Sequence, residues 1–221
     1  MRLERRTVAG GVLVLAAVAA SVLVAPSLPD QLTTHWNAAG QPDGTTGRTA
    51  VLVGGPALVL LVVGSFELVP RVDPLAENFA DFQAAYDAVA VLTAAFAAYA
   101  YGFVLAWNLG YEVAVARALV PAVAVLYVAV GFLMDRAERN WFVGVRTPWT
   151  LSSPAVWRET HDLAATLFKL AGAVALGGLL APELLVYFLA GPVAVAALVA
   201  TVYSYVAYRR LGDGDPADAT P

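Results

Sequence analysis

The sequence has 221 residues, of which 60% are apolar and 14% charged, whereas ordinary soluble domains are roughly 45–50% apolar and about 25% charged. It contains no cysteine, which excludes disulfide frameworks, thiol nucleophiles and cysteine-ligated metals. A formal net charge of −4, with basic residues gathered only beside apolar stretches, argues against direct nucleic-acid binding through phosphate contacts.

Six apolar stretches approach the length of about 20 helical residues that crosses a bilayer. They run from Thr7 to Ala25, Ala50 to Val69, Ala88 to Trp107, Ala118 to Met134, Leu163 to Ala181 and Leu184 to Tyr208. The sequence therefore predicts an all-α polytopic membrane protein, with a bundle of about six transmembrane helices in the lipid bilayer. The first stretch exceeds the apolar core of a signal peptide, so we expect it to be retained.

The basic residues outside the spans indicate an orientation. Arg48 and Arg117 lie on one predicted side, and the other such arginines lie on the opposite side, together with both termini. Because cytoplasmic loops are enriched in Arg and Lys, we expect cytoplasmic N and C termini in a multi-pass protein of the cell membrane. Residues 209–221 are expected to form an acidic, disordered tail.

The predicted outer loop, residues 26–49, is longer than a simple connector requires. Its segment Thr33 to Trp36 has the β-branched and aromatic residues of a short extended piece. Pro42, Asp43 and Gly44 are a turn signal, because Pro sets φ, Asp bonds to local backbone and Gly accepts positive φ.

Two interpretations of this outer loop remain open. It is either a folded cap with Trp36 at the lipid headgroup level, or an external ligand or peptide site that uses His35, Asn37 and Asp43. A metal site is not expected, because His35 has no second histidine on its side of the membrane.

The predicted inner loop, residues 135–162, contains the start of a helix. Ser153 is expected as its N-cap and Pro154 as its first residue. Helical spacing then places Trp157 and His161 on one face.

This inner loop also has two interpretations. One is an amphipathic segment at the membrane interface, anchored by Trp141, Trp149 and Trp157. The other centres on Arg146, whose guanidinium could bind backbone carbonyls, a lipid phosphate or a carboxylate.

Three ionisable residues fall within or at the ends of the predicted spans: Glu67, Asp87 and Lys169. Such groups are costly in a bilayer unless they are paired or hydrated. A pair between Glu67 and Lys169 is geometrically possible. We expect structural pairing or snorkelling of these charges, with a proton or ion relay as the alternative.

The two loops together resemble the SdpI family, whose membrane proteins confer immunity to a secreted antibacterial peptide. The outer loop resembles the family's DUF1648 module, through Pro29, His35, Trp36, Asn37, Gly40, Pro42, Asp43 and Gly44. The inner loop resembles the SdpI module, through Asn140, Gly144, Arg146, Thr147, Pro148, Trp149, Thr150, Trp157, Thr160 and His161.

This resemblance implies a domain organisation. A DUF1648-like helix pair is expected over residues 7–69, a connecting span over 70–117, and SdpI-like helices over 118–208. It implies a membrane immunity protein that meets a toxin peptide outside and recruits a cytosolic transcriptional regulator inside. The alternative is a small exporter of a toxic or amphiphilic solute. We expect no enzyme activity, because no nucleophile elbow, phosphate-cradling loop or paired acid is found, and no cofactor.

Overall fold

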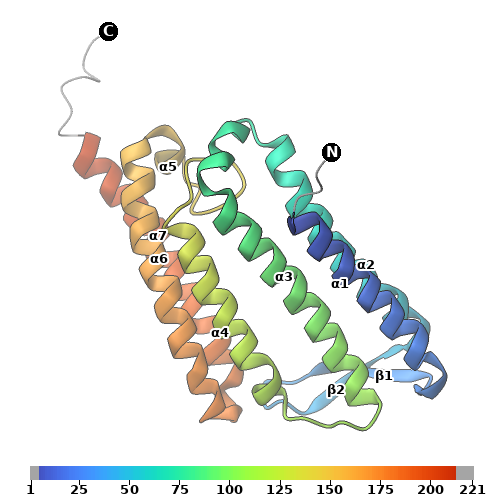
Figure 1. Cartoon of the computed structure of the whole chain (residues 1–221). Coiled ribbons are helices and arrows are strands. Elements are labelled where there is room, and N and C mark those ends of the chain that lie inside the picture. The colour runs from blue at the N-terminus through green and yellow to red at the C-terminus, as the bar shows by residue number, and fades with distance from the viewer. Residues whose placement is uncertain (1–4, 213–221) are drawn as a thin grey trace.

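Six long helices form one bundle in the computed structural model, which describes residues 5–212 (Figure 1). The elements follow in the order α1 (Arg5–Val24), η1 (Ala25–Ser27), β1 (Gln31–Trp36), β2 (Pro42–Gly47), α2 (Arg48–Val72), η2 (Ala76–Asn78), α3 (Phe79–Asn108), α4 (Val115–Met134), α5 (Pro148–Ser152), α6 (Pro154–Ala175), η3 (Leu176–Leu179), η4 (Pro182–Leu184) and α7 (Leu185–Gly212). The elements marked η are short 3-10 turns.

The prediction of six membrane-spanning helices is confirmed, since six helices are long and apolar enough to cross a bilayer. Large side chains such as Leu15, Leu60 and Leu198 are 69%, 58% and 65% exposed on their outer faces. Apolar surface of this extent is stable only against lipid. The protein is therefore a membrane protein.

Some helix boundaries differ from the predicted spans. The third predicted span began at Ala88, but α3 begins at Phe79. The helix predicted from Pro154 and the span predicted from Leu163 are one continuous helix, because no Gly or Pro separates them. Helix α7 continues to Gly212, and the rest of the predicted acidic tail, residues 213–221, lies outside the described residues.

The bundle has two halves. In one half α1, α2 and α3 pack against each other, and in the other α6 packs against α4 and α7, while α3 and α4 join the two. Small residues bring α4 and α6 close together. A Cβ added at Gly131 would lie 2.8 Å from the Ala165 carbonyl oxygen, and one at Gly172 would lie 2.8 Å from that of Ala124. Close backbone approach at small residues is a common means of helix association in membranes.

The two structured connections between spanning helices lie at opposite ends of the bundle (Figure 1). Strands β1 and β2 form an antiparallel hairpin across one end. Helix α5 and its flanking loop lie at the other end, where α1 begins and α7 ends. We call residues 31–47 the hairpin and residues 140–161 the α5 block.

Candidate functional site

The first loop of the α5 block is organised by Asn140, whose side chain is completely buried. Its carbonyl oxygen accepts hydrogen bonds from the backbone N–H groups of Phe142 (2.9 Å) and Val143 (2.6 Å). Its amide donates to the carbonyl oxygens of Glu138 (2.9 Å) and Val143 (3.0 Å). One side chain thus pairs backbone groups that no helix or strand satisfies, which is what a tight buried turn requires.

His161 is buried at the centre of the block and holds the neutral imidazole form. Its Nδ1 donates to the carbonyl oxygen of Trp157 (2.8 Å), while its Nε2 accepts from the backbone N–H of Val145 (3.1 Å). An imidazolium has no acceptor nitrogen, so this pattern needs one unprotonated ring nitrogen. His161 and Trp157 stack with ring centroids 3.9 Å apart, which confirms that they share a helix face.

Gly144 lies directly against this histidine. Its φ is +110°, and an added Cβ would overlap His161 Nε2. Both the backbone conformation and the lack of space therefore require glycine at this position. The glycine, the histidine and Trp157, whose Nε1 donates to the Ala137 carbonyl (2.6 Å), form one packed unit.

Helix α5 is capped by Thr147, and Pro148 is its first residue. The Thr147 hydroxyl accepts from the Thr150 backbone N–H (3.2 Å), and the Thr150 hydroxyl accepts from the Thr147 backbone N–H (2.9 Å). This is the reciprocal arrangement of a capping box. Thr147 Oγ1 also donates to Ser204 Oγ of α7 (3.0 Å), so the cap is attached to the last transmembrane helix.

Of the other motif residues of the block, Arg146 and Trp149 reach its surface, whereas Thr160 is buried. Arg146 is exposed, and its Nη1 donates to the Trp141 carbonyl (2.8 Å). Trp149 is half-buried and packs on Tyr205 of α7, with ring centroids 5.0 Å apart. The hydroxyl of Thr160 is buried and has no hydrogen-bond partner among the described residues. The block therefore combines a buried polar scaffold with an exposed guanidinium.

The interfacial-anchor interpretation is wrong for Trp157. Its side chain is only 3% exposed, because α6 packs it against α3 and the end of α4 in a cluster with Phe82 and Leu133. Trp141, in contrast, is 51% exposed. A helical sequence pattern shows which residues share a face, but not which neighbour covers that face.

The hairpin confirms the predicted extended segment but corrects the predicted turn. Pro42, Asp43 and Gly44 lie in strand β2, while the chain reverses at residues 37–41. There the Asn37 side-chain oxygen accepts from the backbone N–H groups of Ala39 (2.9 Å) and Gln41 (3.0 Å). Gly40 has φ +74°, which completes the turn. The chain therefore reverses through the Asx turn of Asn37 and the positive-φ Gly40. The Pro-Asp-Gly segment comes after this reversal and forms the start of β2.

The remaining hairpin motif residues divide between two faces. The His35 Nδ1 and Asp43 Oδ1 atoms are 2.5 Å apart on the exposed face, where the two side chains are 71% and 42% exposed. Gly44 pairs with His35 across the strands. Trp36 points the other way and packs on Phe103 and Trp107 of α3, with centroids 5.2 and 5.3 Å apart.

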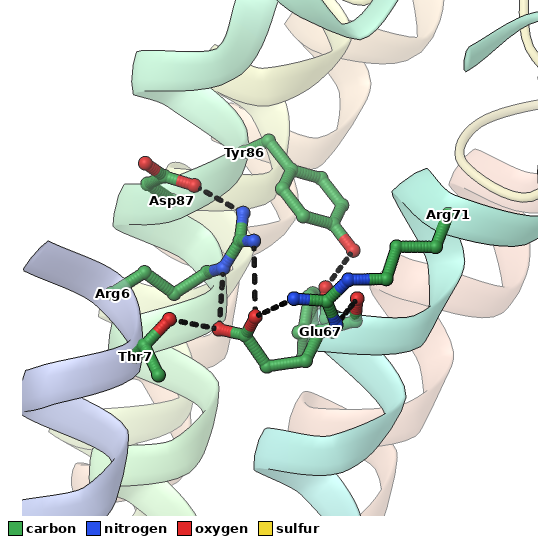
Figure 2. Close-up of polar contacts among 7 residues, drawn as sticks. Arg6, Thr7, Glu67, Arg71, Tyr86 and Asp87 are labelled. Atoms are coloured by element: carbon green, nitrogen blue, oxygen red, sulfur yellow. Dashed lines mark hydrogen bonds and ion pairs between the residues drawn. The ribbon is translucent and has the colours of Figure 1, made fainter. Parts of the chain in front are cut away.

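The possible pair between Glu67 and Lys169 is not formed. Lys169 of α6 instead pairs with Asp135 at the end of α4. Glu67 of α2 accepts from Arg6 Nε of α1 at 2.9 Å, and Arg6 Nη1 donates to Asp87 of α3 at 2.5 Å (Figure 2). Glu67 and Lys169 belong to different halves of the bundle, so their similar depth does not bring them together.

Further contacts complete this second polar site, which we call the Arg6 cluster. Thr7 donates to Glu67 Oε1 (2.9 Å), and Arg71 donates to both its carboxylate (3.2 Å) and its backbone carbonyl (2.6 Å). The Arg6 guanidinium also lies 5.4 Å from the centroid of the Tyr86 ring. Figure 2 shows how these side chains converge from α1, α2 and α3. The cluster fastens the first three helices together near the α5 end of the bundle.

Sequence reasoning missed several of these residues. Arg6 lies on the flank of the predicted first span, at the second position of α1, but an arginine next to an apolar span can also pair with acidic residues of neighbouring helices. The Thr147-x-x-Thr150 spacing could have indicated the capping box. Ser204 had no signal in its local sequence, because its partner lies 57 positions away. Within residues 5–212, no three His, Cys, Asp or Glu side chains are grouped to hold a metal ion.

Comparison with known proteins matches both regions. The model of the SdpI/YfhL protein family matches residues 136–204, and that of a domain of unknown function, DUF1648, matches residues 12–60. Immunity protein SdpI of Bacillus subtilis (strain 168) is 30% identical over 105 residues, which are 47% of this chain and about half (51%) of that protein's length. No solved structure matches. The chain is thus similar to the SdpI/YfhL family in its C-terminal half and to DUF1648 in its N-terminal region, and it is similar to an immunity protein over about half of its length.

Proposed function

We propose that this chain is an immunity protein of the cell membrane that protects against a secreted toxic peptide and relays its presence to a cytosolic regulator. The observation that carries the proposal is one of position: the region that matches the SdpI/YfhL family, residues 136–204, contains the whole α5 block and its partner Ser204. The match to the SdpI/YfhL family therefore covers the buried hydrogen bonds of Asn140, His161 and Thr147.

The hairpin is the proposed toxin-facing surface. His35 and Asp43 stand on its exposed face, beside the Asn37 turn. Their pairing presents a fixed set of polar groups at the end of the bundle while leaving the packing of the helices untouched. This assignment goes together with the proposed orientation, in which both termini are cytoplasmic and the hairpin is outside.

Helix α7 is the proposed route between the two ends. At the hairpin end, Leu185 and Leu189 belong to the apolar cluster that also contains Trp36. At the other end, Ser204 bonds to Thr147 and Tyr205 packs on Trp149. A displacement of the hairpin would act on the first turns of α7, and the α5 block rests on its last turns.

The exposed part of the α5 block is the proposed regulator-binding surface. Trp141 and Phe142 are 51% and 43% exposed, and the guanidinium of Arg146 is bonded to the Trp141 backbone. Exposed aromatic residues beside an arginine are the usual composition of a binding hot spot.

Contacts of the intramembrane charges support this proposal over transport. Glu67 and Asp87 share Arg6, and Lys169 pairs with Asp135, so the three candidate coupling groups sit in two separate structural clusters. A transporter would need these groups to change partners during its cycle.

Survival of a deletion strain tests protection. The strain carries an empty vector, wild type, His35→Ala or Arg146→Ala, and is exposed to culture supernatants of neighbouring strains. We expect protection by wild type, loss of protection with His35→Ala, and protection without transcriptional induction with Arg146→Ala. Arg136→Ala is the matched control, since Arg136 is also exposed and bonded to one backbone carbonyl. Equal survival of all strains would contradict the proposal, and loss of protection on collapse of the proton gradient would favour transport.

A reporter fusion tests the orientation independently. A periplasmic- or surface-active reporter inserted after Thr45 is expected to be active, while one fused after Arg210 is expected to be inactive. The reverse result would place the hairpin in the cytoplasm and overturn its role as the toxin-facing surface.

A further inference from the structure

A side cavity of about 310 Å³ opens beside the α5 block. Residues 144–147 of the α5 block line one side of the cavity. Three spanning helices line the rest, through Met134 of α4, Phe168 of α6, and Ala197 and Thr201 of α7. Ala197 and Thr201 are exposed on the outer face of the bundle. The cavity therefore faces the bilayer from the side and reaches up to the end of the bundle.

Arg146 is the one charged residue in the described lining of this cavity. Its Nη1 is held by the Trp141 carbonyl, which is its one hydrogen bond among the described residues. A guanidinium has five N–H donors in a rigid planar fork that matches phosphate oxygens. Arg146 is thus fixed in place with most of its donors available.

The cavity has a charged group at one end and an apolar wall beyond it, and this arrangement indicates the kind of ligand that fits. A cation sits at the level where α4 ends at Met134, and an apolar wall that includes Phe168 of α6 and Ala197 of α7 continues from it along the spanning helices. An amphiphile with a phosphate at its head and a hydrocarbon chain below has the same order. No acidic side chain in this lining balances Arg146, so an anionic headgroup is favoured over a zwitterionic one.

We propose that this cavity binds one anionic phospholipid, with its phosphate on Arg146 and an acyl chain against Phe168 and Ala197. The lipid belongs to the bilayer leaflet at the α5 end, so the inference holds for either orientation of the chain. It is also independent of immunity, since any bilayer with anionic lipid supplies the ligand. Bound there, the lipid covers the apolar wall between α4, α6 and α7 and accepts hydrogen bonds from the remaining donors of Arg146.

A neighbouring cavity of about 210 Å³ provides the contrast. It lies between the end of α4 and the start of α6, and its charged lining is of both signs: Asp135, Arg136, Glu138, Arg139, Arg158 and Asp162. Because acidic and basic groups alternate there, an anion gains little net attraction. Arg136 is therefore a matched control for Arg146: it is exposed, at the same end, and its Nη1 likewise donates to one backbone carbonyl, at 3.1 Å.

Native mass spectrometry of the full chain in detergent tests the proposal. The protein is titrated with dioleoyl phosphatidylglycerol and, separately, with dioleoyl phosphatidylcholine. We expect one tight phosphatidylglycerol adduct, weakened about tenfold or more by Arg146→Gln, since charge-assisted hydrogen bonds are lost. Arg146→Lys should recover part of the affinity, and Arg136→Gln should leave it unchanged.

Two further measurements separate the contribution of the phosphate headgroup to binding from that of the acyl chain. Ala197→Phe fills the cavity from its exposed side without altering a charge, and it should weaken the lipid adduct while leaving the protein folded. Glycerol 3-phosphate, which has the phosphate but no chain, should compete only weakly. An equal loss of phosphatidylglycerol affinity in Arg146→Gln and Arg136→Gln would show that basic residues at this end attract anionic lipid without a specific site, and it would contradict the proposal. Full competition by glycerol 3-phosphate, or an unchanged adduct in Ala197→Phe, would overturn its assignment to a lipid.

Discussion

The two ends of the bundle use polar residues in opposite ways. At the α5 end, Asn140 and His161 are buried and form hydrogen bonds through both their donors and their acceptors. At the hairpin end, Asn37 and His35 make similar local bonds, but at the surface. The same residue types are therefore buried in the fold at one end and exposed at the other.

This difference follows from what each end must cover. The α5 block packs against α4, α6 and α7, where an unpaired polar group is surrounded by protein and hydrocarbon and costs the full desolvation penalty. The hairpin crosses the end of the bundle and buries one face, through Leu32 and Trp36, while water satisfies the other. Four pairs of matched substitutions, one at each end, test the contrast through SDS-induced unfolding in mixed micelles.

The largest effect is expected for Gly144→Ala. A residue at φ +110° is strained, and the added Cβ would displace His161 with its two hydrogen bonds, so we expect a loss of about 4 kcal/mol in unfolding free energy. Gly40→Ala is the matched change, with φ +74° but only ordinary contact at 3.8 Å; it should cost about 1 kcal/mol. Equal losses would show that backbone strain alone decides both sites.

The next effect concerns arginines near the starts of two helices. Arg6→Gln leaves Glu67 and Asp87 without their buried cation, and we expect a loss of about 3 kcal/mol. Arg48 bonds to Asp30, which is 89% exposed, and to the Leu28 carbonyl at the hairpin end. Arg48→Gln should change the unfolding free energy by less than about 1 kcal/mol. A small effect of Arg6→Gln would mean that water or Arg71 compensates the two carboxylates.

A smaller contrast is expected between two asparagine turns. Asn140→Ala leaves buried backbone groups of the 140–143 turn unpaired, at an expected loss of about 2 kcal/mol. Asn37→Ala removes two similar bonds in an exposed turn, where water replaces them, and should cost less than about 1 kcal/mol. If Asn37→Ala were the more damaging change, the hairpin turn would be a folding determinant rather than a surface element.

The smallest stability effect is expected for His35→Ala. Its side chain is 71% exposed, so the unfolding free energy should change by less than about 0.5 kcal/mol. The same variant should lose protection in the survival assay described above. His161→Ala is the counterpart and should destabilise the protein clearly, because Val145 N–H and the Trp157 ring lose a buried partner. A stable His161→Ala with lost protection would instead give that histidine a direct role.

The sequence correctly predicted the features that depend on residues close together in the chain. The apolar lengths predicted all six spans, and Ser153-Pro154 predicted the start of α6. The Thr33 to Trp36 segment was correctly read as extended. The turn prediction at Pro42 to Gly44 was wrong because the chain already reverses at residues 37–41. There the Asn37 side chain accepts two backbone hydrogen bonds and Gly40 adopts a positive φ.

The sequence by itself determined the class of this protein, a membrane bundle with two organised loops, because hydrocarbon solvent leaves few ways to satisfy a helical backbone and sets the length of each helix. Only the tertiary structure decided the partners. Arg6 with Glu67, Lys169 with Asp135 and Thr147 with Ser204 join different helices, and a helix pattern carries no information on which neighbour faces it. Burial likewise made Trp157 and His161 part of the core and left Arg146 at the rim of a cavity, because helix packing decides which motif residues are covered.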